Sequence, residues 1–140
     1  MGTILFLLAA FFILALNYSD LPEQIPVHYN GEGEIDKYGP KINLWVVPIL
    51  ASLICFGIVK SNKWIPKMNP KIVERELFVI NWGSRILSLL IAFAFSYITI
   101  QTVNIARKGS GSLGTWFLPV AAIGMIILPF LPLIWFKKKR

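Results

Sequence analysis

Residues 21–41, LPEQIPVHYNGEGEIDKYGPK, separate two long apolar segments and carry most of the unusual residues of the chain. They include the single histidine, three prolines, three glycines and four of the seven acidic residues. Proline fixes φ and favours an extended conformation in the residue before it, and Gly-Glu-Gly at 31–33 is a turn signal. We therefore expect an ordered loop here, either a short hairpin or a loop folded onto a membrane surface.

The composition of the whole chain excludes an ordinary soluble domain. Of its 140 residues 56% are hydrophobic and only 15% are charged, whereas soluble domains carry about 25% charged residues, and the mean hydropathy is +0.65. The net charge is +7, but the basic residues lie at the ends of apolar segments, as orientation signals do. The sequence thus predicts the lipid bilayer as a partner and no nucleic acid.

Four apolar segments have lengths near the roughly 17–25 residues that cross a bilayer as a helix. They are residues 3–16, 42–59, 86–103 and 116–136. The third segment has an upstream extension to residue 77, and its polar residues 81–85 are expected at the membrane interface. We predict an all-α integral membrane protein, a single domain of residues 1–140, with four transmembrane helices. An ordered external loop, residues 19–41, connects helices 1 and 2.

The distribution of lysine and arginine predicts the orientation. With four spans both termini share a side, and that side carries ten of the fourteen basic residues. The ten are Lys60, Lys63, Lys67, Lys71, Arg75, Arg85, Lys137, Lys138, Lys139 and Arg140; the other four are Lys37, Lys41, Arg107 and Lys108. Because cytoplasmic loops are enriched in basic residues, we expect both termini in the cytoplasm and residues 19–41 outside.

The external segment is dense in polar groups, and three interpretations of them stay open. Imidazole and carboxylate are common ligands of divalent metals, so His28, Glu32 and Asp36 are candidate ligands, although their spacing matches no closed metal motif. General-base catalysis by His28 requires a positioned nucleophile, and nothing in the sequence marks one. In the third interpretation, hydrogen bonds from side chains such as His28 and Asp36 hold the loop in shape.

A longer pattern in this segment resembles a known family. The pattern L-P-x-x-I-P-x-H-[FY]-N-x-x-G-x-x-D-x-x-G-x-K is formed by Leu21, Pro22, Ile25, Pro26, His28, Tyr29, Asn30, Gly33, Asp36, Gly39 and Lys41. It is similar to the small membrane domain of unknown function at the amino end of SdpI-like bacteriocin immunity proteins, and the similarity covers about residues 1–60. The remaining residues, 61–140, form a basic cytoplasmic connector and helices 3 and 4, which do not match the carboxyl-terminal region of those proteins.

The resemblance implies a multi-pass protein of the bacterial plasma membrane. It also implies immunity to a secreted peptide toxin, in some relatives combined with sequestering a transcriptional regulator. The candidate ligand-binding or loop-structuring residues are His28, Asn30, Gly33, Asp36 and Lys41. The leading hypothesis is a non-enzymatic module that binds a secreted peptide toxin or an envelope component. The alternatives are a metal-dependent enzyme at the outer interface and a non-catalytic scaffold subunit with a membrane-protein partner; no cofactor is predicted apart from a divalent metal.

Overall fold

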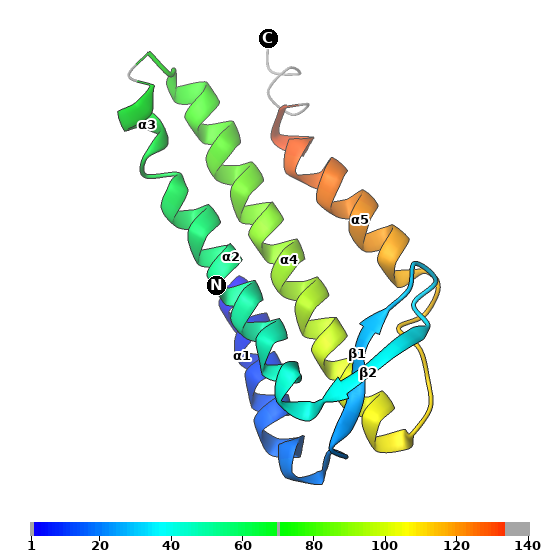
Figure 1. Ribbon diagram of the computed structural model, residues 1–140. Coiled ribbons are helices and arrows are strands. Elements are labelled where there is room, and N and C mark those ends of the chain that lie inside the picture. Colours follow the sequence, from blue (N-terminus) through cyan, green and yellow to red (C-terminus); the bar gives the residue numbers. More distant parts are fainter. Residues whose placement is uncertain (1, 70, 134–140) are drawn as a thin grey trace.

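One long helix, α4, is the axis around which the other elements are arranged (Figure 1). The computed structural model describes residues 2–69 and 71–133. Along the chain the elements are α1 (Gly2–Asn17), η1 (Tyr18–Asp20), β1 (Gln24–Tyr29), β2 (Ile35–Pro40), η2 (Lys41–Trp45), α2 (Val46–Ser61), α3 (Ile65–Met68), α4 (Glu74–Lys108), α5 (Phe117–Ile127) and η3 (Leu128–Phe130). Helix α4 contacts α1, α2, α5, η3 and β1.

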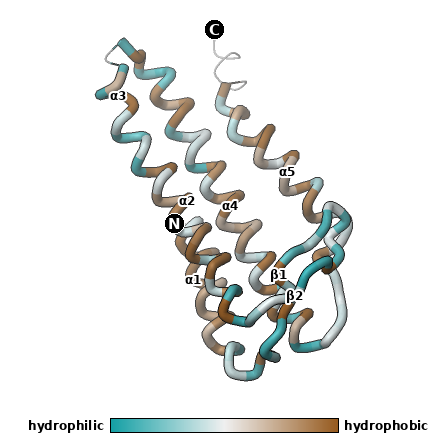
Figure 2. The backbone as a smooth tube through the Cα atoms, in the orientation of Figure 1, coloured by the Kyte–Doolittle hydropathy of each residue, from teal (hydrophilic) through white to brown (hydrophobic). Residues whose placement is uncertain are grey.

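Three helical segments among the described residues are long and apolar enough to cross a membrane. They are Gly2–Asp20, Lys41–Ser61 and Glu74–Lys108. The fourth expected span, residues 116–136, is helical over Phe117–Leu133, a shorter apolar segment, and its last three residues lie outside the described ones. Figure 2 shows hydrophobic residues along the helices and hydrophilic ones gathered in the hairpin and near α3. The chain is therefore a mostly helical protein with three candidate membrane-spanning helices.

Helix α4 is longer than the expected third span because the polar residues 81–85 continue the helix. Its 35 residues correspond to about 52 Å at roughly 1.5 Å per residue, against a hydrocarbon core of about 30 Å. Glu74 and Glu76 lie in its first turn and Arg107 and Lys108 in its last, charges that suit the two ends of the helix dipole. It ends at Gly109, which has the left-handed φ of 74°.

Helix α1 lies along the carboxyl-terminal half of α4. The Ser96 hydroxyl donates a hydrogen bond of 2.7 Å to the carbonyl oxygen of Phe6. Near the end of both helices, the Arg107 guanidinium donates to the side-chain oxygen of Asn17 at 2.7 Å. The buried positions of α4 are mostly small or hydroxyl-bearing residues, which allow neighbouring helices to approach closely.

The later parts of α2 and of the last helical segment pack on the amino-terminal half of α4. The side-chain amide of Asn62, just after α2, donates to the hydroxyl of Ser84 at 2.5 Å. Gly83 faces the turn at η3, where a Cβ atom on residue 83 would lie 2.7 Å from the carbonyl oxygen of Pro129. The glycine is thus needed for this close helix crossing.

The expectation of an all-α protein is wrong for part of the segment between α1 and α2. Strands β1 and β2 form a two-stranded antiparallel sheet, which is the hairpin alternative that the sequence left open. An isolated two-stranded hairpin is at best marginally stable in water. Packing against α4 and the α4–α5 connection, described below, therefore has to hold it.

Candidate functional site: the hairpin and the groove beside it

The hairpin is fixed to the helices by buried side chains at the start of β1. Ile25 is fully buried and packs in a cluster of residues from α1, the hairpin, η2 and α4; its other buried members are Leu14, Leu21, Leu44 and Val103. At the end of the same strand, the Tyr29 hydroxyl and the Thr102 hydroxyl of α4 lie 2.8 Å apart in a hydrogen bond. Burial raises the pKa of Tyr29 above its ordinary value, and the bond to Thr102 lowers it by less. Tyr29 therefore stays neutral at physiological pH.

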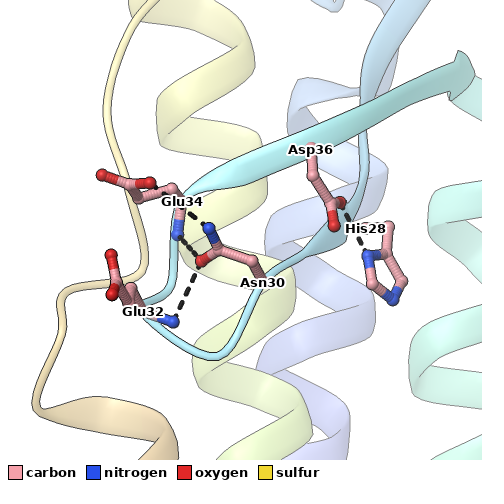
Figure 3. Close-up of polar contacts among 5 residues, drawn as sticks. All are labelled: His28, Asn30, Glu32, Glu34 and Asp36. Atoms are coloured by element: carbon pink, nitrogen blue, oxygen red, sulfur yellow. Dashed lines mark hydrogen bonds and ion pairs between the residues drawn. The ribbon is translucent and has the colours of Figure 1, made fainter.

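Asn30 organises the turn between the strands (Figure 3). Its side-chain oxygen accepts hydrogen bonds of 2.9 Å from the backbone N–H groups of Glu32 and Glu34. Its side-chain amide donates to the Glu34 carboxylate at 3.3 Å, and its backbone carbonyl accepts from the N–H of Gly33 at 2.9 Å. The structure thus brings Asn30 and Gly33 together in a turn of the Asx type.

Gly33 joins the turn to the segment that connects α4 to α5. Its φ is +79°, and its carbonyl oxygen accepts a hydrogen bond of 2.8 Å from the backbone N–H of Leu113. A Cβ atom at residue 33 would lie 2.8 Å from the carbonyl oxygen of Gly114. Glycine is required at position 33 for both reasons, its backbone conformation and the close approach of Gly114.

Lys41 lies at the base of the hairpin, apart from the turn. Its ammonium group donates to the carbonyl oxygen of Leu21 at 3.2 Å and lies 3.0 Å from the Glu23 carboxylate. It also lies 5.4 Å from the centre of the Tyr18 ring, within the range of a cation–π contact. These contacts tie the end of β2 to the chain that enters β1, so Lys41 structures the loop.

His28 and Asp36 form the one contact between side chains of the pattern that is largely open to solvent. The His28 Nδ1 and Asp36 Oδ1 atoms lie 2.6 Å apart, with the two side chains 66% and 43% exposed. A register shift between the pairs His28–Lys37 and Tyr29–Ile35 leaves Asp36 without a partner in the strand pairing. Even with His28 protonated, an exposed ion pair of this kind would contribute little to folding, about 0–1 kcal/mol. The pair is therefore available for another role.

A groove of about 560 Å³ lies beside this pair. Its walls come from the hairpin, η2, the start of α2, the second half of α4, the α4–α5 connection and the start of α5. Most of the lining is apolar, including Val47, Ile98 and Leu118, and its polar members are His28, Tyr29, Lys37, Asn43 and Thr102. Such a volume and lining suit the binding of a small ligand or of an apolar side-chain cluster.

The groove contains residues that sequence reasoning did not find. Lys37 and Asn43 lie close to the pattern, but nothing in their spacing distinguishes them. Ile98, Thr102 and Leu118 come from elements that meet the hairpin only in three dimensions. The usable signal was the pattern itself, because its positions Ile25, Pro26, His28 and Tyr29 all line the groove.

Of the three candidate metal ligands, the structure brings two together, His28 and Asp36, and leaves Glu32 apart. Within residues 2–69 and 71–133 no group of three His, Cys, Asp or Glu residues is placed to hold a metal ion. His28 and Asp36 are in contact, whereas Glu32 lies at the turn, beyond Asn30 (Figure 3). A divalent metal at this site stays a prediction.

Comparisons with known proteins identify part of the chain. Residues 5–51 match the family model "Domain of unknown function (DUF1648)". The chain is 31% identical over 71 residues to an "Uncharacterized protein" of Archaeoglobus fulgidus. That alignment covers 49% of this chain and 39% of the relative, so the chain spans about two fifths of the relative's length. No solved structure matches the chain. The matched residues run from α1 through the hairpin to the first turns of α2, so the chain is similar to DUF1648 over this segment.

Proposed function

We propose that this protein is a non-enzymatic binding module of the bacterial plasma membrane. Its groove beside the hairpin takes an apolar part of a secreted peptide toxin or envelope component, and the module confers immunity or sensing. The observation that carries the proposal is the exposed His28–Asp36 pair beside an apolar groove. The resemblance to the SdpI-like domain points in the same direction.

The construction of the hairpin supports a binding role. Buried Ile25, the Tyr29–Thr102 bond and the Gly33–Leu113 bond fix it to the helices independently of His28 and Asp36. A site that is rigid before binding loses less conformational entropy when the ligand arrives. The exposed ammonium group of Lys37, which forms no hydrogen bond or ion pair with any described residue, adds a positive charge to the groove.

The membrane topology is part of the proposal. Helix α5 and the residues after it form the fourth span, both termini are cytoplasmic, and the hairpin is external. Two observations support this arrangement. Helix α3 and the hairpin lie at opposite ends of α4 (Figure 1), and most basic residues of the described parts of the chain belong to α2, the connector and the first half of α4, toward the α3 end. A cysteine introduced at exposed Gly31 should react with an impermeant thiol reagent on whole cells, and lack of reaction would contradict the topology.

Protection of a bacterial host tests the function. Cells that express the wild type, His28→Ala, Asp36→Asn or the control Lys108→Gln are challenged with culture supernatants that contain secreted peptides. We expect survival with the wild type and the control, and loss of protection with the two site variants at equal membrane levels. Full protection by both site variants would refute the role of the pair.

The contact between His28 and Asp36 also favours a second candidate, a metal-dependent enzyme at the outer interface. Imidazole and carboxylate together are frequent zinc ligands, and a ligand set with an open position would leave room for a substrate. Stoichiometric metal in the purified protein, lost in His28→Ala, would support this candidate. Metal content that is unchanged in His28→Ala would exclude His28 as a ligand.

A further inference from the structure

A second cavity lies at the α3 end of α2, opposite the end of α2 that adjoins the hairpin. Its volume is about 550 Å³, and it is lined by Phe56, Val59, Lys60, Lys63, Trp64 and Lys67. These residues belong to the end of α2 and to the start of the connector, including α3. The cavity shares no residue with the groove beside the hairpin.

The cavity combines an apolar wall with unpaired positive charge. Phe56, Val59 and Trp64 are exposed, at 65%, 49% and 55%. The three lysines form no ion pair with an acidic residue in the described parts of the chain. Two of them instead lie over aromatic rings: Lys60 is 5.6 Å from the centre of Phe56 and Lys67 is 5.1 Å from that of Trp64.

The position of the cavity relative to the candidate span explains this combination. Phe56 and Val59 lie in the last turns of the span Lys41–Ser61, where a helix leaves the hydrocarbon. The lysines and Trp64 lie at or just beyond its end, at the depth where lysine side chains reach phosphates and tryptophan rings favour the interface. An amphiphile with an apolar chain and an anionic head matches both parts of the cavity.

We propose that this cavity is a binding site for an anionic phospholipid. The ammonium groups of Lys60, Lys63 and Lys67 contact the headgroup phosphate, and the first part of an acyl chain lies against Phe56 and Val59. The lipid thereby supplies the negative charge that the described chain does not place beside these lysines. This inference does not rest on the function proposed for the hairpin.

Quenching of Trp64 fluorescence by brominated lipids tests the proposal on the full chain. The protein is reconstituted in bilayers of phosphatidylglycerol and phosphatidylcholine at equal mole fractions, with bromine on the acyl chains of one lipid or the other. The emission of Trp64 is the difference between the wild type and Trp64→Phe. We expect at least about twofold stronger quenching by brominated phosphatidylglycerol, given the attraction of each lysine to anionic lipid.

Two double variants that remove the same number of positive charges distinguish a specific lipid site from the general attraction of a basic protein to anionic lipid. Lys60→Gln with Lys67→Gln should bring the quenching by the two lipids close to equality. The control variant combines Lys37→Gln with Lys108→Gln, two residues at the hairpin end. It should keep the wild type's stronger quenching by brominated phosphatidylglycerol. Equal quenching by both lipids in the wild type would overturn the proposal. The lysines would then be assigned to binding an acidic segment of another protein. An equal loss of preference in both double variants would also overturn it, because bulk charge would then explain the effect.

Discussion

The backbone N–H of Leu113 donates a hydrogen bond of 2.8 Å to the carbonyl oxygen of Gly33, across 80 residues of sequence. Gly33 lies in the turn of the hairpin, and Leu113, buried at 2% exposure, lies between α4 and α5. The Tyr97 hydroxyl in turn donates to the carbonyl oxygen of Leu113 at 3.0 Å. The segment that matches DUF1648 is thus in direct contact with the second half of the chain, and part of the groove wall comes from that half.

The Gly33 contact predicts the effect of adding one methyl group to the turn. Gly33→Ala forces a left-handed conformation on alanine and pushes its Cβ against Gly114. We expect a loss of about 1–3 kcal/mol of unfolding free energy, measured by thermal unfolding in detergent. Gly31→Ala is the matched control, because a Cβ at residue 31 meets nothing within 4 Å. Equal stability of the two variants would show that the close approach to Gly114 is absent.

The bond between Tyr29 and Thr102 predicts a coupling between the hairpin and α4. Tyr29→Phe removes one partner of this part-buried pair and should cost about 1 kcal/mol. In a double-mutant cycle with Thr102→Val, the coupling energy should be of the same size. Tyr38→Phe serves as the control, since Tyr38 is 56% exposed. Strictly additive effects of the two substitutions would contradict the bond.

The same hydroxyl predicts a dependence on alkaline pH. Burial raises the pKa of Tyr29 in the folded state above its ordinary value near 10.0, so the folded state favours the neutral hydroxyl. Its contribution to stability is complete below the unfolded pKa and is lost as the pH rises through the higher folded pKa. The stability difference between wild type and Tyr29→Phe should therefore shrink only above about pH 10. A difference that already vanishes between pH 7 and 9 would contradict the burial of Tyr29.

The crossing of α4 with η3 predicts a contrast between two helical glycines. Alanine favours a helix over glycine by about 1 kcal/mol at either position. At Gly83, however, its Cβ would lie 2.7 Å from the carbonyl oxygen of Pro129, so Gly83→Ala should destabilise the protein by about 1–3 kcal/mol. Gly57→Ala, where the added Cβ meets open space, should be neutral or stabilising. Stabilisation by both substitutions would argue against the close crossing.

Hydropathy sufficed to locate the helical segments, because the length and polarity of a span are local properties. The starts of α1 and α2 fall within a few residues of the predicted ones. Helix α4, Glu74–Lys108, extends beyond the predicted span and its upstream extension at both ends. The place of residues 81–85 at the membrane interface stays a prediction. The sequence also left the hairpin and a surface loop equally open, since period-two alternation is weak in a segment rich in proline and glycine.

The candidate site was predictable only in part. The pattern included both His28 and Asp36, and the structure places them in contact. For Asn30, Gly33 and Lys41 it shows loop-structuring contacts, which a list of residue types could not distinguish from ligand binding. The partners of Gly33 and Tyr29 lie in distant elements, and no local spacing in one sequence encodes such tertiary pairs.

Filling the groove tests the central claim most directly. Val47 lines the groove at the start of α2, whereas Leu53, on the same helix, is 64% exposed and outside the groove lining. The measurement is survival of bacteria expressing Val47→Trp or Leu53→Trp, at equal membrane levels, under challenge with peptide-containing supernatants that the wild type resists. We predict that Val47→Trp loses protection because the indole occupies the groove, while Leu53→Trp keeps it. Equal protection by the two variants would contradict binding in the groove.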